Sequence, residues 1–481
     1  MADCRCCECL NFYPKCQYED DYSTKTNYQD LVASCPYFET IKHEITPEEL
    51  EGILSLTIKR DQAIKLILFL TLLLTYTEAE QVNHIISAGT TLGKTYVTSE
   101  LLWFFPQDDI IKLDGASKTA FIHKSTALFV DKRTFEPFDP IVLPKRKDFP
   151  LDASGKAEYQ DAINDYFERM KERKEFGVSF LDYSRKIIWL PDMPNVELLK
   201  TVRSLLSHDS KFCNYSITRG DNLKTKEVLI KGFPSWIFTT TYTEIDPQDI
   251  SRNFLHTPED SEEKIKEAID LIARKKSDEN FQKWYESESI RVKLKTRVML
   301  IKNVNVEKIF APNEIMENLK NWMLEKAKLK PKIMRDFPRV ISIAEGYAML
   351  NFPMRKRSED GKVLYVSEAD AEVAKKLYSL ILESNELGLT PECYELFLNV
   401  VTPLCNNEVG ATLSEIHHKY FGWKRRACSE SRLKGMLKNL ETGGLITCDK
   451  SKKTYHWILV KTTEEEKLQD QKLDDFKEGA S

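Results

Sequence analysis

One segment of the chain combines the residue types that proteins use to bind phosphate groups. It reads Ala88-Gly-Thr-Thr-Leu-Gly-Lys94-Thr95 and matches the pattern G-x-x-x-x-G-K-T, with alanine at the first position. The backbone N–H groups of such a loop and the N-terminus of the following helix form a nest for anions. We expect Lys94 to reach the β- and γ-phosphates of ATP and Thr95 to hold Mg²⁺. The candidate nucleotide-binding residues are Gly89, Thr90, Thr91, Leu92, Gly93, Lys94, Thr95 and Tyr96.

The surroundings of this loop are those that phosphate binding requires. Residues 83–88 predict a short strand, and a helix is expected from about Gly93. The alternative is an ordinary strand–turn–helix connection, because short matches to Gly-Lys-Thr also arise by chance.

A carboxylate at the end of a neighbouring strand is the second requirement of such an ATPase. Residues 186–190 predict a strand, which is followed by Pro191 and Asp192. In P-loop ATPases, the acid-bearing strand is usually an apolar run followed by two acidic residues. Here Pro191 occupies the first acidic position and Asp192 the second. Asp192 is therefore a candidate for orienting water or for contacting Mg²⁺ indirectly. The alternative is that Asp192 only caps the next helix.

Two more polar groups follow the next expected strand, residues 235–239. This strand ends in hydroxyls, and Thr239 or Thr240 is a candidate contact for the attacking water or the γ-phosphate. Arg252 comes about ten residues later, where an arginine can act as a finger toward ATP bound by a neighbouring copy. The alternative for a lone arginine is a surface ion pair.

Taken in this order, the segments resemble the AAA+ ATPases, and within them the minichromosome-maintenance (MCM) helicases and their relatives in mobile elements and archaea. The matching pieces are SAGTTLGKT, KIIWLPD, the expected hairpin before WIFTTT, and DISRNF, which is similar to the family's arginine-finger segment. The segment RDFPRVISIAE is similar to the family's lid helix, which makes Arg335 the sensor-2 candidate and Arg339 the fallback. The resemblance covers roughly residues 60–385.

The sequence departs from the family pattern at three places. Ala88 replaces the first glycine of the loop, Pro191 replaces the first acid, and a threonine replaces the sensor-1 asparagine. With these changes, we still expect nucleotide binding. The sequence does not fix the rate of ATP hydrolysis. The N-terminal oligonucleotide-binding domain of MCM helicases also has no counterpart in the residues that precede the loop.

A hairpin is expected over residues 212–230, before the sensor-1 strand. In the family that it resembles, this hairpin points into a central pore and grips DNA. Here it carries Arg219, Lys224 and Lys226, whose contacts with phosphates would not depend on the DNA sequence. The alternative is a solvated basic loop.

Cysteines are concentrated at the start of the chain. Cys6, Cys9, Cys16 and Cys35 offer four thiolates, which suit tetrahedral Zn²⁺ and would fold a module too small for its own core. Cys4 and Cys7 form a second C-x-x-C in an overlapping register, so the ligand set stays open. An iron–sulfur cluster and free thiols are the alternatives.

Positive charge gathers near the C-terminus of a chain whose net charge is −5. Between Thr412 and Lys461 there are 11 Lys or Arg and 4 Asp or Glu, which gives +7. Helices followed by two short strands resemble a winged helix, with a recognition helix over 429–441. A protein contact is the alternative to DNA binding. The candidate DNA-binding cations here are Lys424, Arg425, Arg426, Arg432, Lys434 and Lys438.

Composition and pattern define the fold class. The chain has 481 residues, and its 42% hydrophobic content excludes disorder for most of them. The most apolar run, Leu66–Leu74, is shorter than the roughly 20 residues that a membrane helix needs. The start of the chain does not read as a signal peptide, so we expect a cytoplasmic protein without membrane contact. Alternating strands and helices predict an α/β fold, a P-loop NTPase (AAA+) core with a parallel sheet.

Five parts are expected along the chain. They are a zinc-binding module at 1–45, the ATPase core at 46–257, a helical lid at 258–385, a winged helix-turn-helix at 386–461 and a disordered acidic tail at 462–481. The resemblance implies an ATPase that acts as an MCM-like DNA helicase in replication, as a homo-oligomer and by family a hexamer. The alternative is an ATP-switched, DNA-binding initiator or regulator with little hydrolysis, which Pro191 favours. A nucleotide-dependent protein remodeller is a third possibility.

Overall fold

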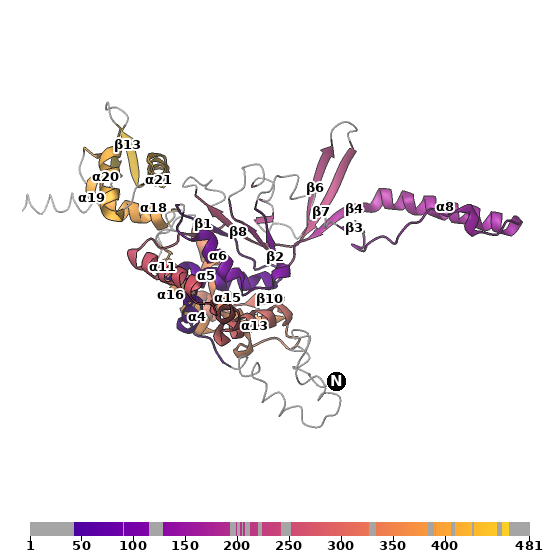
Figure 1. Ribbon diagram of the computed structural model, residues 1–481, viewed down its shortest axis with the longest axis horizontal. Coiled ribbons are helices and arrows are strands. Elements are labelled where there is room, and N and C mark those ends of the chain that lie inside the picture. Colours follow the sequence, from indigo (N-terminus) through magenta and orange to yellow (C-terminus); the bar gives the residue numbers. More distant parts are fainter. Residues whose placement is uncertain are drawn as a thin grey trace, which may run out of the picture.

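The computed structural model describes residues 43–89, 91–114, 128–192, 199, 203, 205–206, 212–219, 224–241, 252–326, 333–382, 389, 391–405, 409–425, 428–449 and 455–460. Side chains are described in the same ranges except at 216–219, 224–226 and 391. Figure 1 shows a central body with a long helix extending from one side and the C-terminal helices and strands at the other.

The body is built on a five-stranded parallel sheet in the order β2-β5-β8-β1-β9. Its strands are β1 (His84–Ser87), β2 (Ile110–Lys112), β5 (Ile187–Leu190), β8 (Ser235–Thr240) and β9 (Phe254–His256). All but β2 are buried along their whole length, as expected for parallel strands covered on both faces. This confirms the predicted α/β fold with a parallel sheet. Because parallel strands end at one edge, β1, β5 and β8 bring the residues that follow them together.

Helices with many buried apolar residues pack with this sheet to form the core. In α4 (Pro47–Ser55), the Thr46 hydroxyl accepts a hydrogen bond from the backbone N–H of Glu49 and so caps the helix. The apolar run predicted from the sequence forms α5 (Gln62–Leu72), which is buried almost throughout and continues into η2 (Leu73–Tyr76). No helix among the described residues is both long enough and apolar enough to span a membrane.

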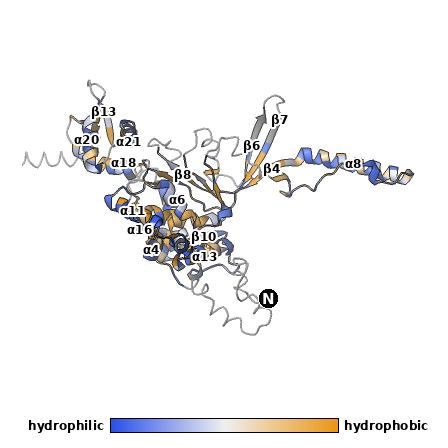
Figure 2. Cartoon of the chain, in the orientation of Figure 1, coloured by the Kyte–Doolittle hydropathy of each residue, from blue (hydrophilic) through white to orange (hydrophobic). Residues whose placement is uncertain are grey.

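The other helices of the body pack around α5. Figure 2 shows the apolar residues gathered in the sheet and in the helices that lie beside it. These elements are α6 (Lys94–Leu102), α11 (Glu262–Ser277), α12 (Phe281–Ser287), α13 (Ser289–Asn303), α14 (Asn313–Lys326), α15 (Ile333–Leu350), α16 (Glu368–Ser379), the parallel pair β10 (Lys308–Phe310) and β11 (Val363–Tyr365), and the short turns η3 (Gln107–Asp109) and η6 (Phe352–Met354). The short turn η4 (Arg146–Asp148) lies outside the body, where Arg146 contacts Pro150 and Tyr159.

Gly346 marks the closest approach of α15 to α5. A Cβ atom at Gly346 would lie 2.4 Å from the backbone oxygen of Leu70. Backbone atoms of a packed helix cannot yield locally, so we expect Gly346→Ala to lower the free energy of unfolding by about 1–3 kcal/mol. Denaturant unfolding measures this. Gly52→Ala is the matched control, because a Cβ there meets nothing within 4 Å. Equal unfolding midpoints for Gly346→Ala and the unmodified protein would contradict the close packing.

Two buried histidines contact each other between β1 and β9. His84 Nδ1 lies 3.1 Å from His256 Nε2, and the rings stack with centroids 5.3 Å apart. Burial, with the charge of Arg339, lowers the pKa of His256 to about 3. Burial, then His256 and Arg339, lowers the pKa of His84 well below its usual range. Both rings are therefore neutral in the folded protein.

This histidine pair predicts a loss of stability in mild acid. The unfolded chain protonates its histidines near pH 6.5 whereas the folded protein does not, so the unfolded state binds more protons as pH falls. We expect His256 alone to cost about 1.4 kcal/mol of unfolding free energy between pH 7.5 and pH 5.5. Measurement of the unfolding free energy as a function of pH tests this. In His256→Asn, the slope of this free energy against pH should decrease by the equivalent of about one bound proton. Parallel profiles would contradict the assignment.

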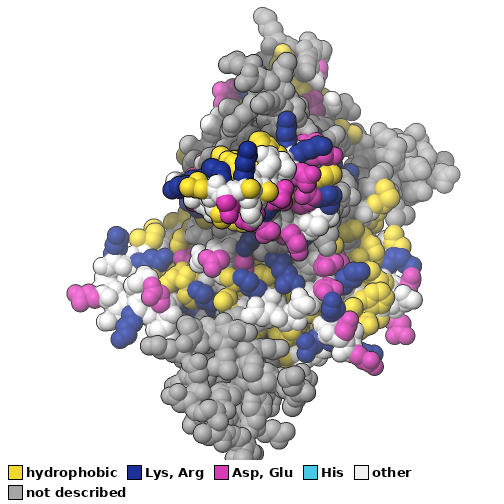
Figure 3. Space-filling model, turned by 90° about the vertical axis from the view of Figure 1, so that its right-hand side faces the viewer, with side chains coloured by type: hydrophobic (Ala, Val, Ile, Leu, Met, Phe, Trp, Pro, Cys, Tyr) yellow, Lys and Arg dark blue, Asp and Glu magenta, His cyan; other side chains and the backbone are white. Residues whose placement is uncertain are grey.

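A second, four-stranded sheet lies outside the central one, in the order β3-β4-β7-β6. Its strands are β3 (Leu128–Asp131), β4 (Gly177–Asp182), β6 (Phe212–Arg219) and β7 (Lys224–Lys231), and α8 (Ala153–Phe176) connects β3 to β4. The carboxylate of Asp152 caps α8 at Gly155, the one described residue of this helix that is buried. Figure 3 views the molecule from the side of α8 and shows positive, negative and apolar side chains interspersed. The sequence predicted the hairpin over 212–230, but not the sheet that joins it to β3 and β4.

The C-terminal residues form a unit with its own apolar core, which includes Leu396, Tyr420 and Leu433. Three strands form an antiparallel sheet in the order β12-β14-β13. The elements are α18 (Pro391–Leu396), the π-helical turn η7 (Phe397–Val401), α19 (Thr402–Cys405), β12 (Ala411–Thr412), α20 (Leu413–Lys424), α21 (Glu430–Thr442), β13 (Ile446–Asp449) and β14 (His456–Leu459).

Candidate functional site

The loop between β1 and α6 has the backbone shape of an anion nest. Thr91 and Gly93 both adopt positive φ angles, 71° and 83°, and Gly93 is the N-cap of α6. This N-cap makes no side-chain hydrogen bond, so the first N–H groups of α6 have no cap from it. The Lys94 ammonium donates to the carbonyl oxygens of Ala88 and Gly89, at 2.9 and 2.8 Å. Thr90 lies outside the described residues.

Ala88 directly follows β1 and extends its hydrogen bonding to β8, so it is not part of the open loop. Its N–H donates to the carbonyl oxygen of Thr240 at 3.2 Å, and its side chain is fully buried. A glycine is therefore not needed at this position, because a methyl group fits in the core beside β8. This explains why the first glycine of the pattern can be replaced here.

The ends of β5 and β8 carry the other predicted polar groups to the same edge of the sheet. Thr240 pairs with Ser87 at the end of β1, so it lies directly beside the start of the loop. Asp192, which is exposed after β5, acts electrostatically on Lys94. Thr239 is turned toward β5, and its hydroxyl donates to the carbonyl oxygen of Pro191. The structure thus brings Lys94, Asp192 and Thr240 together.

The charge of Lys94 is only partly compensated in this arrangement. Burial lowers the pKa of Lys94, and Arg432 of the C-terminal unit lowers it further, whereas Asp192 and Glu392 raise it. A group of two cations and two carboxylates therefore surrounds the loop. An anion bound in the nest would favour the charged form of Lys94.

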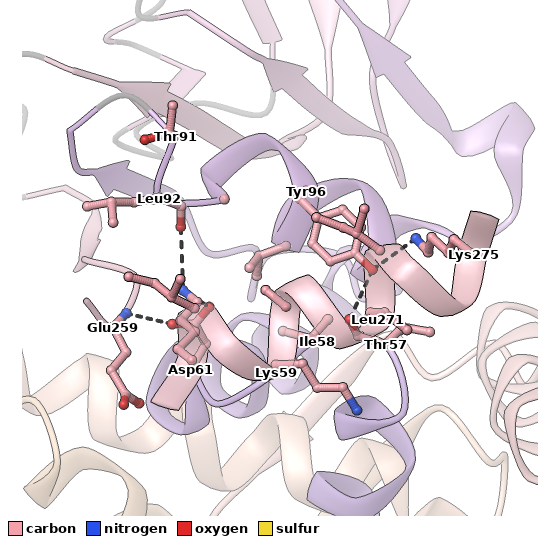
Figure 4. A pocket seen from close by; sticks show the side chains of 16 residues that line it. Thr57, Ile58, Lys59, Asp61, Thr91, Leu92, Tyr96, Glu259, Leu271 and Lys275 are labelled. Carbon is pink, nitrogen blue, oxygen red and sulfur yellow. Dashed lines mark hydrogen bonds and ion pairs between the residues drawn. The ribbon is translucent and has the colours of Figure 1, made fainter. Parts of the chain in front are cut away.

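A cavity of about 320 Å³ opens beside the loop and was not predicted from the sequence. Figure 4 shows Leu92 and Tyr96 lining it from the loop and α6, Leu271 from α11, and Ile58 from the turn after α4. Most of its wall is apolar. The lining residues are Thr57, Ile58, Lys59, Asp61, Thr91, Leu92, Gly93, Tyr96, Val97, Glu259, Lys264, Ile265, Ala268, Leu271, Ile272 and Lys275.

Hydrogen bonds fix Tyr96 in the wall of this cavity. Its hydroxyl donates to the carbonyl oxygen of Thr57 at 3.0 Å and accepts from the ammonium of Lys275 at 3.1 Å (Figure 4). Lys275 also lies 4.7 Å from the centre of the Tyr96 ring. The ring is therefore held in place, and burial raises the pKa of its hydroxyl. Such a rigid aromatic and apolar wall suits a flat heterocycle.

A buried ion pair ties the turn before α5 to α11. The Lys264 ammonium lies 2.6 Å from Asp61 Oδ2 and also donates to the carbonyl oxygen of Leu92 at 3.4 Å. Asp61 has a positive φ of 50° and accepts a hydrogen bond from the backbone of Glu259 at 2.6 Å (Figure 4). Lys264 thus connects the phosphate loop to both other walls of the cavity.

The predicted arginine finger lies far from the loop of its own chain. In the parallel strands β1 and β9, His84 lies beside Phe254. Arg252 comes two residues before Phe254, whereas Gly89 comes five residues after His84, so the two lie toward opposite ends of these strands. The five residues from His84 to Gly89 alone correspond to roughly 16 Å of extended chain, while Arg252 and Asn253 form a turn and a bend before β9. Arg252 is half-buried at the opposite edge of the sheet and cannot reach phosphates bound at the loop of the same chain.

The two lid arginines lie at this same opposite edge. Arg339 is buried and donates to Asp336 and to the carbonyl oxygen of Asn253, next to Arg252. Arg339 therefore holds the edge strand in place. Arg335 is exposed in the first turn of α15, adjacent in the chain to Asp336. Of the two sensor-2 candidates, only Arg335 is open to another molecule.

The hairpin cations lie at the far end of β6 and β7. Arg219 pairs with Lys224 in the last rung of the ladder, and Lys226 pairs with Ile217. Figure 1 shows these strands rising out of the body. Only the backbone of these cations is described, and residues 220–223 lie outside the described part.

The C-terminal cations divide into two groups. Arg425, Lys434 and Lys438 are exposed, and Lys434 pairs with Glu430 on the same helix at 2.6 Å. Lys424 is largely buried beside Glu395, at 2.9 Å. Arg432 is directed toward the phosphate loop. Because two residues along a helix differ by about 200° in direction, Arg432 and Lys434 point to opposite sides of α21. Arg426 lies outside the described residues.

The predicted zinc ligands Cys6, Cys9, Cys16 and Cys35 lie outside the described residues. Within the described ranges, no group of three or more histidine, cysteine, aspartate or glutamate side chains is placed to hold a metal ion. The comparisons with known proteins add no family: no protein-family model matches the chain, and no curated protein matches its sequence.

Proposed function

We propose that this protein is an ATP-dependent, ring-forming DNA motor of the MCM helicase type. The observation that carries the proposal is the meeting of Lys94, Asp192 and Thr240 at one edge of the sheet, around a loop with the backbone of an anion nest. These are the groups that a P-loop ATPase requires: a lysine for the phosphates, a carboxylate on a neighbouring strand, and a polar group near the attacking water.

Each residue has a definite task in this account. The N–H groups of the loop and of α6 bind the phosphates, and Lys94 exchanges its bonds to Ala88 and Gly89 for phosphate oxygens. Thr95, exposed in the first turn of α6, would hold Mg²⁺, which neutralises phosphate charge, and Asp192 would orient water or contact the ion indirectly. The apolar cavity beside Tyr96 takes the base. Thr240 contacts the attacking water or the γ-phosphate.

The order of the strands supports the resemblance to AAA+ ATPases. The strand that carries the sensor residue, β8, lies between the loop strand β1 and the acid-bearing strand β5. This is the arrangement expected for an AAA+ core. The helices α11 to α16 follow the core in the chain and correspond to the expected lid.

The position of Arg252 supports the proposed assembly into a ring. At roughly 16 Å or more from its own loop along β1, this arginine would act as a finger at the site of a neighbouring copy. Arg335 lies at the same edge and would enter the same site. Such a head-to-tail contact closes into a ring when its rotation closes, and the family resemblance favours six copies.

Two parts of the chain support DNA as the partner. The β6–β7 ribbon carries Arg219, Lys224 and Lys226 away from the body. In the C-terminal unit, α20 and α21 with the β13–β14 hairpin support the winged-helix prediction, with Lys434 and Lys438 on the exposed side of α21. The zinc module stays a prediction from the cysteine spacing.

An ATP-switched initiator with slow hydrolysis is the second candidate, and Pro191 favours it. Pro191 stands where the first acid is expected, and its carbonyl oxygen accepts a hydrogen bond from Thr239. The site therefore offers one carboxylate, Asp192, where two are usual. Weaker Mg²⁺ binding and slower turnover follow from this loss.

ATP turnover with and without single-stranded DNA separates these candidates. The motor predicts turnover that DNA stimulates at moderate salt. Tight ATP binding with negligible turnover in both conditions would favour the switch. An ATPase without DNA affinity even at low salt, where phosphate contacts are strongest, would overturn both and favour a protein remodeller.

A further inference from the structure

Arg432 of the C-terminal unit lies against the phosphate loop. The carbon at the centre of its guanidinium group is 3.9 Å from the Cβ position that a side chain at Gly89 would have. Its Nη1 donates to the carbonyl oxygen of Thr241 at 3.1 Å, just beyond the end of β8. Arg432 thus reaches the edge of the sheet where Lys94, Asp192 and Thr240 meet, although it belongs to a different unit of the chain.

A buried carboxylate holds Arg432 in this position. Arg432 Nη2 donates to Glu392 of α18, and the two side chains are 14% and 6% exposed. The Tyr420 hydroxyl donates to the same carboxylate at 3.3 Å. Arg432 Nε is also buried, and it has no hydrogen-bond partner among the described residues. The guanidinium therefore keeps donor capacity directly beside the loop.

A phosphate group is the natural additional partner for this guanidinium. Arginine binds phosphate through two parallel N–H donors, and such charge-assisted bonds are stronger than neutral ones. Lys94 already experiences the positive charge of Arg432. Without an anion the two cations repel each other across the loop, and an anion between them would relieve this repulsion.

We propose that Arg432 is a ligand of the terminal phosphate of the nucleotide, supplied by the C-terminal unit of the same chain, with Glu392 as its positioning residue. This inference rests on the proposed nucleotide site and adds a ligand to it. ATP draws Arg432 toward the loop and away from Glu392, whereas ADP leaves the Arg432–Glu392 pair intact. The nucleotide state is thereby linked to the placement of α18 and α21.

Opposite responses of two variants test this role. Arg432→Gln should weaken ATP binding by about tenfold to a hundredfold and ADP binding by less than about threefold. Glu392→Gln leaves Arg432 free to turn to phosphate, so it should keep or tighten ATP binding. A merely structural pair would respond in the same direction to the loss of either partner. Calorimetric titration of the full chain with ATP and with ADP measures both affinities.

Two control variants separate this role from loss of folding and from a general loss of positive charge. The double variant Arg432→Gln/Glu392→Gln leaves no unpaired buried charge, so it should fold normally and still bind ATP weakly. Lys419→Gln removes an exposed cation from α20 and should leave both affinities unchanged. If the unmodified protein binds ATP and Lys94→Ala does not, but Arg432→Gln keeps the same preference for ATP over ADP, this inference is wrong and the nucleotide site stands. If the unmodified protein binds neither nucleotide, the nucleotide site itself is wrong.

Discussion

Replacement of Lys94 by alanine is expected to weaken ATP binding by about tenfold to a hundredfold and to reduce turnover by about 10²–10³-fold. Lys94 is the cation at the centre of the loop, and its ammonium donates to the carbonyl oxygens of Ala88 and Gly89. Phosphate oxygens are stronger partners, because the bond then joins opposite charges. Removal of the lysine therefore also removes bonds that stabilise the charge on the phosphates in the transition state.

In a measurement without nucleotide, the protein should not lose stability through this change. Burial and Arg432 both disfavour the charged form of Lys94, so its removal relieves a cost in the folded state. We expect Lys94→Ala to unfold at the same temperature as the unmodified protein or higher without nucleotide, and to gain no stability from added ATP. Lys171→Ala, an exposed lysine of α8, is the control and should behave as the unmodified protein. ATP binding by Lys94→Ala at unchanged affinity would contradict the site.

Replacement of Arg252 by alanine is expected to separate binding from turnover. An arginine finger contributes about 10³–10⁵-fold to the rate, so turnover should fall by at least about 10³-fold. ATP affinity should stay within about threefold, because Arg252 lies at the edge of the sheet opposite to its own loop. Arg357→Ala removes another exposed arginine and should leave turnover unchanged. A parallel loss of ATP binding and turnover in Arg252→Ala would contradict the assignment in trans.

Local patterns predicted the centre of the site. The glycines, Lys94 and Thr95 are adjacent in the chain, and the strands before and after them are short apolar runs. The parallel sheet then followed from the alternation of strands and helices. The second sheet did not, because β3 pairs with β4 and β4 pairs with β7 across about fifty residues of sequence each, and such pairing is not encoded in local pattern. β9 has only three residues, too few for a periodic signal.

The cavity for the base could not be found from spacing. Its walls come from the turn around Ile58, from the loop and α6 around Tyr96, and from α11 around Leu271. In the sequence, these residues are ordinary apolar positions of three separate helical segments. Thr91, Leu92, Gly93 and Tyr96 alone gave a signal, because they belong to the phosphate motif or follow it directly. A cavity depends on how the segments pack, which the fold alone determines.

Arg432 shows the same limit at a single residue. From the sequence it belonged with Lys434 and Lys438 as a DNA-binding cation of one basic helix. The structure turns Arg432 toward Glu392, 40 positions earlier in the chain, and leaves Lys434 exposed on the other side. Arg432 and Lys434 contribute equally to the net charge of the segment, but Arg432 is largely buried and Lys434 is exposed. The DNA-binding role of the exposed lysines stays a prediction.

Mixing two inactive variants tests the central claim most directly. Lys94→Ala lacks a working loop but supplies Arg252, and Arg252→Ala lacks the finger but supplies Lys94. In a ring of randomly mixed chains, about a quarter of the interfaces combine an intact loop with an intact finger. We therefore predict that an equal mixture recovers up to about a quarter of the turnover of the unmodified protein. A mixture no more active than its separate components, under conditions where the chains co-assemble, would contradict an ATP site shared between neighbouring copies.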